Sequence, residues 1–211
     1  MSALRPVLAL GVCAALAAAT GVAGATTKAA TPKPVCNLIT DAKGDGSVVT
    51  GSDDLDILSG DIATNAKTIT AVLRLAGDPS SVNPQAPGGK EYYVSFVAPG
   101  SDQPQFLSAS FDPTGGATYE TGYTEDINGV GNQTSDPDPV IGAVKGDVLT
   151  ITAPLSAFSS RVNVKPGKKL TSLSADVFAL IGVSGAGLLA NADTATGTSY
   201  VAGTPSCVKP G

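Results

Sequence analysis

The sequence contains no histidine and no tryptophan among its 211 residues. Without histidine, neither a Ser-His-Asp nor a Cys-His nucleophile system can be assembled, and nearly every catalytic zinc or non-haem iron site is excluded. Without tryptophan, an aromatic platform for a sugar would depend on tyrosine or phenylalanine. We therefore expect a protein that is not an enzyme. A carboxylate-pair glycosidase is the remaining enzymatic alternative, because that chemistry needs no histidine.

Charged residues are also scarce, at 15 % of the sequence, and 18 acidic residues outnumber 13 basic ones. An acidic chain without a basic cluster repels a phosphate backbone, so nucleic acid is not an expected partner. Apolar residues make up 42 % of the chain, which is too much for a wholly disordered protein. The length suits one well-cored domain and is short for two.

Residues 1–25 have the pattern of a cleavable export signal. Arg5 precedes an uncharged apolar run from Val7 to Ala19, and Ala23-Gly24-Ala25 fits the A-x-A motif of a cleavage site. The run is shorter than the roughly 20 residues that span a bilayer as a helix. We expect a secreted protein, extracellular or associated with the cell envelope, with no membrane span after cleavage. An uncleaved N-terminal anchor is the alternative. Residues 26–35 are expected to form a flexible leader.

The rest of the chain alternates apolar and polar residues over short runs that end at Gly, Pro or Asn, which predicts strands and turns. In 68–75, for example, Ile69, Ala71, Leu73 and Leu75 share one face. We predict an all-β fold over residues 36–208: a two-sheet antiparallel β-sandwich, jelly-roll or immunoglobulin-like, with eight to ten strands and one helical turn at 153–160. The other predicted strands are 56–64, 92–97, 106–111, 148–152 and 170–183.

Three further segments receive specific predictions. The residues 65–67 are expected to form a tight hairpin turn. Residues 126–140 are rich in Gly, Asn, Asp and Pro and are expected to form a long loop without regular structure. Asp193 is expected to begin the last hairpin, which leads into 199–202.

Two cysteines, Cys36 and Cys207, frame the predicted domain. In an exported protein such a pair is expected to form an intramolecular disulfide, which would make the first and last strands neighbours. Two free thiols or an intermolecular bond are the alternatives.

The residues 41–56 contain five carboxylates within a Gly-containing stretch: Asp41, Asp45, Asp53, Asp54 and Asp56. Oxygen ligands of this kind suit Ca²⁺, so this segment predicts a calcium site of structural rather than catalytic role. The spacing does not fit an EF-hand loop, because Lys43 and Ser52 occupy positions that need acidic side chains. A solvated, Asp-rich turn is the alternative.

This segment resembles the start of known extracellular β-sandwiches. The residues Asp41, Gly44, Asp45, Asp56 and Ile57 match the pattern D-x-x-G-D followed by D-I at the opening of a strand, with the next strand at 69–75. The pattern is similar to family-9-type carbohydrate-binding modules and to C-terminal domains of secreted glucan-degrading enzymes and surface proteases. The resemblance implies structural calcium and sugar binding between aromatic rings. The Ala/Gly/Thr-rich composition also resembles small secreted proteins of actinobacteria.

The remaining candidate residues are tyrosines and carboxylates. Without tryptophan, an aromatic ligand platform would have to come from Tyr92, Tyr93, Tyr119 and Tyr123. The expected partner is then a cell-wall or extracellular polysaccharide, or another surface protein. A structural envelope protein without a small ligand is the alternative. Glu120, Glu125 and Asp126 are the candidates for a glycosidase pair, and an exposed strand that runs into a loop is the simpler interpretation of the same residues.

Overall fold

A computed structural model of the protein describes residues 33–46, 52–127, 130–136, 139–158, 160–182 and 188–211. The predicted export signal and residues 26–32 of the predicted leader lie outside these ranges. Among the described residues, no helix has the length and apolarity that a membrane crossing requires.

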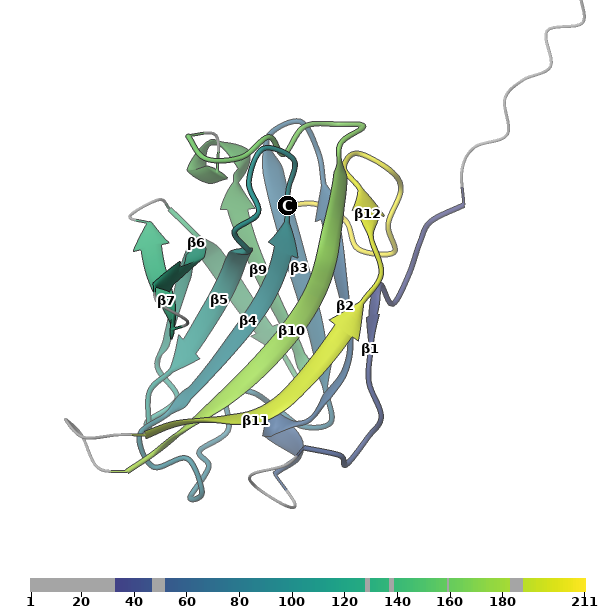
Figure 1. The fold of residues 1–211 in the computed structure, drawn as a ribbon. Coiled ribbons are helices and arrows are strands. Elements are labelled where there is room, and N and C mark those ends of the chain that lie inside the picture. The colour runs from purple at the N-terminus through teal and green to yellow at the C-terminus, as the bar shows by residue number, and fades with distance from the viewer. Residues whose placement is uncertain (1–32, 47–51, 128–129, 137–138, 159, 183–187) are drawn as a thin grey trace, which may run out of the picture. The chain divides into compact units, whose positions relative to one another are not determined.

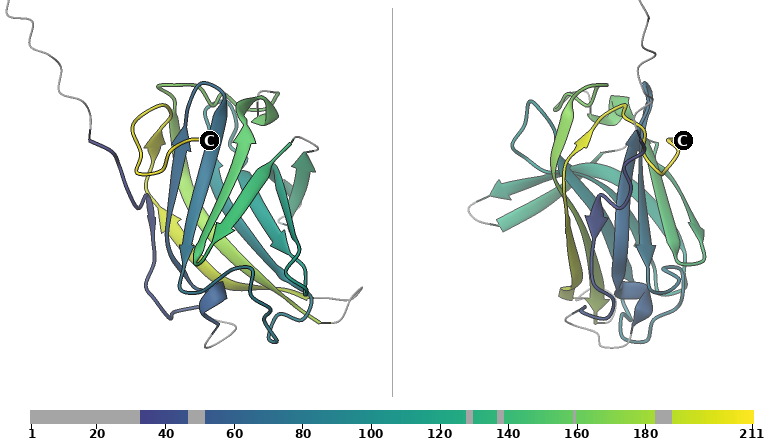
Figure 2. Two further views of the ribbon diagram at one scale, coloured as in Figure 1. Left: turned by 180° about the vertical axis from the view of Figure 1, so that it is seen from behind. Right: turned by 90° about the vertical axis from the view of Figure 1, so that its right-hand side faces the viewer.

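Twelve antiparallel strands in the described part of the chain form one continuous sheet that folds into two packed layers (Figures 1 and 2). The front layer has the order β7 (Val130–Asp136), β6 (Ala117–Ile127), β5 (Gln105–Phe111), β4 (Lys90–Val97), β10 (Lys169–Ile181) and β11 (Leu188–Gly197). The back layer has the order β2 (Ile57–Thr64), β3 (Thr68–Leu75), β9 (Val148–Pro154) and β8 (Ile141–Lys145).

Strand β1 (Ile39–Thr40) joins the two layers, because it pairs with β11 on one side and with β2 on the other. Strand β12 (Tyr200–Val201) pairs with the start of β10. The prediction of an all-β sandwich is confirmed, with the difference that the two layers belong to one sheet rather than to two separate ones.

The core lies between the layers and follows the predicted alternation. Ile69, Ala71, Leu73 and Leu75 are all at most 1 % exposed. The inward residues of β4, β5 and β10 face them and complete one apolar cluster. Each fully buried aliphatic or aromatic side chain contributes roughly 1.5–3 kcal/mol to folding. The largest fully buried side chains include Tyr92, Tyr200, Phe96, Phe106, Phe158 and Ile39.

Most of the predicted strands are confirmed to within a few residues, and 68–75 is confirmed at both ends. The turn at 65–67 joins β2 to β3, and the Asn65 side chain stabilises it by accepting hydrogen bonds from the N–H groups of Lys67 (2.7 Å) and Thr68 (2.8 Å). The predicted helical turn is the short 3₁₀ helix η2 (Leu155–Phe158).

Two predictions of irregular structure are wrong. Residues 130–136 form β7, which pairs with β6 from Thr121 to Ile127. Asp193 lies inside β11 rather than at the start of a hairpin. In both segments Asn, Asp and Gly favour turns locally, but hydrogen bonds to a long neighbouring strand outweigh that preference. Gly122 supports the first of these pairings, since a Cβ there would lie 2.0 Å from the Thr134 carbonyl oxygen.

The disulfide between Cys36 and Cys207 is confirmed, with the two Cα atoms 5.2 Å apart. Val35, which falls in the predicted leader, pairs with Ser206 in an isolated parallel bridge. Its N–H donates to the Pro205 carbonyl, and its carbonyl accepts from Cys207 N–H. The neighbour of the first strand is β11, not the last strand β12, so the predicted pairing of first and last strands is wrong in detail.

Replacement of both cysteines by serine is expected to lower the free energy of unfolding by about 2–5 kcal/mol, because the bond closes a loop of 171 residues in the unfolded chain. Urea unfolding of the wild type and of Cys36→Ser, Cys207→Ser and the double variant measures this. The two single variants and the double variant should show the same decrease in the free energy of unfolding, since each lacks the disulfide. A double variant as stable as the wild type would contradict the expectation.

Candidate metal centre

The loop that follows β1 lies against both layers of the sandwich. Asp41 N–H donates to the Leu58 carbonyl of β2 (3.2 Å). Gly44 has a φ of +84°, a left-handed conformation that glycine adopts without strain. Gly46 approaches β11 so closely that a Cβ there would lie 3.1 Å from the Ala192 carbonyl oxygen. The loop is therefore held between the start of β2 and the middle of β11.

Three carboxylates meet at this loop. Asp41, Asp45 and Asp193 each present one oxygen, and the three oxygens lie within 4.8 Å of one another. Asp193 is brought there by an irregularity in the pairing of β10 with β11, where the register shifts between Val177 and Phe178. Such bulges re-aim side chains. Asp193 is 6 % exposed and accepts the Ile57 N–H at 2.7 Å, which ties β11 to the first residue of β2.

Asp56 lies close enough to Asp41 to raise the pKa of that carboxyl, and it has an unpartnered oxygen of its own. Its side chain is 6 % exposed, and its Oδ2 accepts the N–H of Gly44, inside the loop, at 2.8 Å. Its Oδ1 is buried without a hydrogen-bond partner, and so is Oδ2 of Asp41. A buried carboxylate oxygen without a donor is costly. Asp41, Asp45, Asp56 and Asp193 are called the acidic cluster below.

The electrostatics of the site disfavour the ionised forms of Asp41 and Asp193. Burial raises the pKa of Asp41, and the neighbouring carboxylates of Asp45 and Asp56 raise it further, against a lowering by the Ala42 N–H. Burial likewise raises the pKa of Asp193, with Asp41 adding to the effect and the Ile57 N–H opposing it. A cation bound among these oxygens would supply the missing partner and remove the repulsion.

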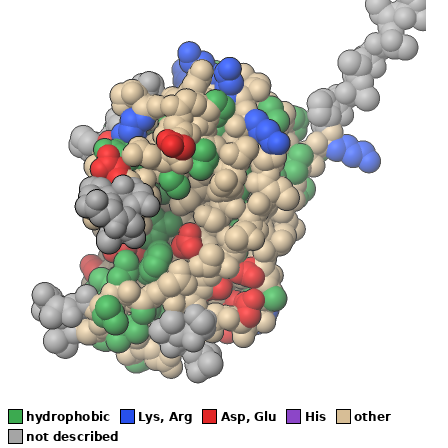
Figure 3. Space-filling view, viewed as in Figure 1, with side chains coloured by type: hydrophobic (Ala, Val, Ile, Leu, Met, Phe, Trp, Pro, Cys, Tyr) green, Lys and Arg blue, Asp and Glu red, His purple; other side chains and the backbone are tan. Residues whose placement is uncertain are grey.

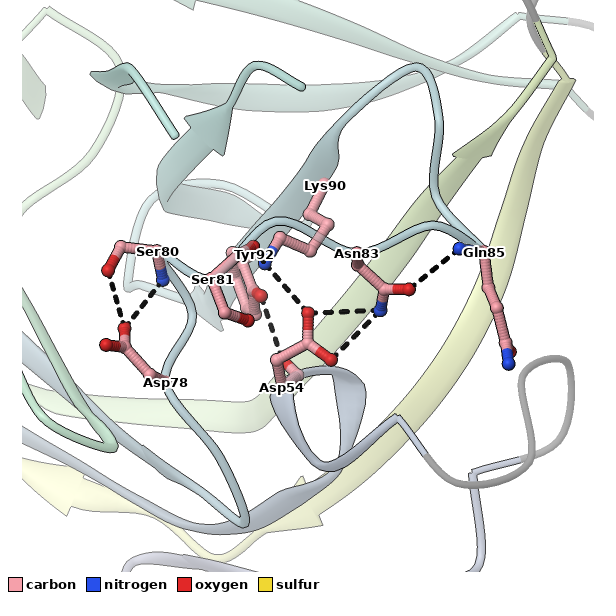
Figure 4. Close-up of polar contacts among 8 residues, drawn as sticks. All are labelled: Asp54, Asp78, Ser80, Ser81, Asn83, Gln85, Lys90 and Tyr92. Carbon is pink, nitrogen blue, oxygen red and sulfur yellow. Dashed lines mark hydrogen bonds and ion pairs between the residues drawn. The ribbon is translucent and has the colours of Figure 1, made fainter. Parts of the chain in front are cut away.

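Two of the five carboxylates predicted to bind calcium lie elsewhere. Asp53 is exposed on the short 3₁₀ helix η1 (Asp53–Leu55). Asp54 is buried in a separate polar network (Figure 4). Its Oδ2 pairs with the Lys90 ammonium at 2.8 Å, and its two oxygens accept from the Asn83 amide at 2.9 and 3.1 Å. These donors occupy the Asp54 carboxylate, so it has no part in the acidic cluster.

The Asp54 network fastens the 78–85 loop onto the front layer. Lys90 is 3 % exposed and also donates to the Ser81 carbonyl at 2.6 Å. Tyr92, two residues after Lys90 on β4, donates its hydroxyl hydrogen to the Asp54 carbonyl at 2.8 Å (Figure 4). A buried ion pair that is hydrogen-bonded on both sides fixes a unique arrangement, and the loss of one partner is strongly destabilising.

The four tyrosines predicted to bind a ligand do not lie on one surface. Tyr92 is fully buried in the core. Tyr93 is buried on the outer side of the front layer, where it packs edge-on against Phe106 and Phe178 and donates to Glu91. Tyr119 packs against the apolar core, and Tyr123 lies under the Arg161 guanidinium, 4.6 Å from its ring centre. Together they form no stacking platform.

Two of the three candidate glycosidase carboxylates, Glu120 and Glu125, do not have the geometry of a catalytic pair. Glu120 and Glu125 lie on β6, five residues apart, so they point to opposite faces and are separated by about 17 Å along the strand. Glycosidases need their two carboxyl groups roughly 5–9.5 Å apart. The side chain of Asp126 lies outside the described residues.

Comparison of the chain with protein-family models, with curated proteins and with solved structures gives no match in any of the three. The resemblance to carbohydrate-binding modules therefore stays a prediction, and the site has to be interpreted from its own geometry.

Lys90→Met is expected to lower the free energy of unfolding by about 3 kcal/mol, because it leaves the buried Asp54 carboxylate without its counter-charge. Urea denaturation measures the change. The control is Lys145→Met, an exposed lysine whose replacement should change stability by less than about 0.5 kcal/mol. The double variant Lys90→Met/Asp54→Met should recover part of the loss. Equal stability of Lys90→Met and wild type would show that the ion pair is dispensable.

Proposed function

We propose that this protein is a secreted, non-enzymatic β-sandwich binding module whose fold is stabilised by one Ca²⁺ ion in the acidic cluster. The observation that carries the calcium part is the convergence of Asp41, Asp45 and Asp193 beside a buried, unpartnered oxygen of Asp56.

The chemistry of the four side chains favours Ca²⁺ over smaller or softer ions. Ca²⁺ takes six to eight oxygen ligands at about 2.3–2.6 Å, so ligands on opposite sides of the ion lie about 5 Å apart. The three converging oxygens lie within 4.8 Å of one another, which is close enough for one such ion to contact all three. Mg²⁺ needs metal–oxygen distances of about 2.0–2.1 Å in strict octahedral geometry. Carboxylates from three separate segments of the chain suit that requirement less well. The set contains neither sulfur nor imidazole, which Zn²⁺ prefers.

The expected role of the ion is structural. Its ligands come from the loop after β1, from the residue before β2, and from the middle of β11, so one ion would join both layers of the sandwich. The complete absence of histidine and the separation of Glu120 from Glu125 argue against catalysis. A disulfide that frames the domain supports an oxidising compartment and hence secretion. The competing function is that of a purely structural envelope protein, for which no ligand is expected.

Addition of Ca²⁺ to the metal-free protein is expected to raise the melting temperature by about 5–10 °C when the ion is present at about 100 times its Kd. Differential scanning calorimetry, with and without a chelator, measures this. Asp41→Asn and Asp193→Asn should abolish the rise while keeping a hydrogen-bond acceptor in place. Asp41→Asn should also melt higher than the wild type without Ca²⁺, because it relieves carboxylate repulsion and keeps the one oxygen that accepts a hydrogen bond, from the Ala42 N–H.

Asp53→Asn is the matched control, since Asp53 belongs to the same acidic segment but lies outside the acidic cluster. It should retain the full response to Ca²⁺. A melting temperature that is the same with Ca²⁺ and with chelator would refute the calcium proposal.

The gain from Ca²⁺ is expected to depend on pH. Burial raises the pKa of Asp41 and Asp193 above the ordinary 3.8, so without metal their contribution to stability is present below that value and is lost as the pH rises through the raised pKa. Ca²⁺ binds the ionised carboxylates, so the rise in melting temperature should be absent near pH 3 and complete near pH 7. Melting curves across this range, with and without Ca²⁺, test it. A rise of equal size at both ends would contradict it.

A further inference from the structure

Residues 33–46 carry one cysteine of the disulfide and two carboxylates of the acidic cluster, and they are called the β1 segment below. The segment pairs with the two layers through Ile39 and Thr40 of β1. Within it, only Leu38 and Ile39 are buried. Fixing the backbone of each residue costs conformational entropy, and burial of two apolar side chains offsets little of that cost for a segment of this length. The β1 segment therefore depends on the bonds at its two ends.

Ile39 fills a space between two glycines. It lies opposite Gly60 of β2 and Gly197 of β11 in the two ladders. A Cβ at Gly197 would lie 2.7 Å from the Ile39 side chain, and one at Gly60 would lie 3.3 Å from it. Because neither strand has a side chain here, the docked Ile39 fills the space and an undocked Ile39 would leave it empty. A close-packed core does not deform gradually, so β1 has two discrete states, docked and undocked.

The disulfide fixes the start of the β1 segment. Cys36 and Cys207 are both exposed, so a small thiol can reach the bond while the sandwich stays folded. Reduction by a dithiol such as dithiothreitol transfers two electrons and two protons: the protein gains two cysteine thiols, and the dithiol becomes a cyclic disulfide. This reaction removes the covalent connection three residues before Ile39.

The acidic cluster fixes the end of the β1 segment. Asp41 and Asp45 belong to the segment, whereas Asp56 precedes β2 and Asp193 lies in β11. Figure 3 shows a group of acidic side chains low on the right of this face, in the region where Figure 1 draws the loop that follows β1. An ion among the four carboxylates would connect the segment to both layers. Without the ion, the charges of Asp45 and Asp56 repel that of Asp41, which favours release.

We propose that the β1 segment is a redox-controlled switch: the oxidation state of Cys36 and Cys207 sets the affinity of the acidic cluster for Ca²⁺. The disulfide and the ion both favour the docked state of β1 over the undocked one. Thermodynamic linkage then requires reciprocity, so Ca²⁺ favours oxidation of the two thiols by the same factor by which oxidation strengthens Ca²⁺ binding. The proposal rests on the calcium site proposed above. In an oxidising compartment that contains Ca²⁺, both bonds hold β1 in place.

Titration of Ca²⁺ against a fluorescent chelator, with the oxidised and the dithiothreitol-reduced full protein, tests the proposal. We expect the Kd for Ca²⁺ to be about tenfold higher in the reduced protein, within the roughly 5–150-fold range of coupled sites. The double variant Cys36→Ser/Cys207→Ser should bind as weakly as the reduced wild type, which excludes a direct effect of the reductant. Saturating Ca²⁺ should in turn lower the reduction potential of the disulfide, by about 30 mV for a tenfold coupling.

Amide hydrogen exchange at Thr198 reports the docking of β1, because its N–H donates to the Leu38 carbonyl at 2.9 Å. Exchange should be fastest in the reduced, metal-free protein, slower with either the disulfide or Ca²⁺, and slowest with both. The reference is the Leu155 N–H, which donates to the Lys67 carbonyl in the β2–β3 turn and should exchange at the same rate in all four states.

Three variants provide the controls. Asp41→Asn should remove the effect of Ca²⁺ on reduction, and Asp53→Asn, outside the acidic cluster, should retain it. Phe158→Leu leaves a cavity beside the buried helix residue of η2, which packs on β6 and β9, and so lowers the stability of the whole sandwich. It should leave the Kd of the oxidised protein for Ca²⁺ unchanged.

An equal Kd in the oxidised and reduced protein would overturn this proposal and leave the calcium proposal intact. Failure of the oxidised protein to bind Ca²⁺ would overturn both. A loss of affinity in Phe158→Leu as large as in the cysteine variant would assign the coupling to global stability and overturn the switch. Faster exchange of Leu155 together with Thr198 on reduction would do the same, since β1 would then not open as a separate unit.

Discussion

The structure depends on the pairing of β1 with two strands at once. Two residues, Ile39 and Thr40, form ladders with β11 of the front layer and β2 of the back layer, so the joint between the layers contains very few hydrogen bonds. Other interactions stabilise β1 at both of its ends. Cys36 is bonded covalently just before it, and Asp41 enters the acidic cluster just after it. The disulfide and the candidate metal centre thus support the same weak point.

The distribution of charge connects the remaining features. The carboxylates of Asp45 and Asp56 repel that of Asp41 near β1, while the exposed Lys67 and Lys165 lie toward the far end of β2. The net charge of −5 conceals this separation, because it averages the two ends. The calcium site that we propose lies at the acidic end, where carboxylate oxygens without hydrogen-bond partners suit a hard cation.

The sequence allowed the prediction of features that depend on local pattern. The strict alternation from Ile69 to Leu75 predicted β3, and the Asp-rich segment from Asp41 to Asp56 predicted three of the four members of the acidic cluster. Asp193 was missed, because it lies in a turn-like segment and reaches the site only through a change of register and a bond to Ile57, 136 residues away. Asp54 was misplaced for a related reason, since its partner Lys90 arrives from another strand. A groove that Ala66, Pro99 and Lys165 line at one end of the sandwich was also missed, because the segments that line it are far apart in the sequence and only packing brings them together.

The bond between Cys36 and Cys207 has a mechanical consequence. The segment before Cys36 and the segment after Cys207 are connected directly through the two sulfur atoms. The sheet belongs to the loop that this bond closes, so it does not lie on the direct covalent connection between the two segments. A pull exerted on those two outer segments would be transmitted by the covalent bond, and the hydrogen bonds of the strands would carry almost no tension. A protein attached at one end and loaded at the other would therefore keep its fold under shear for as long as the bond remains oxidised.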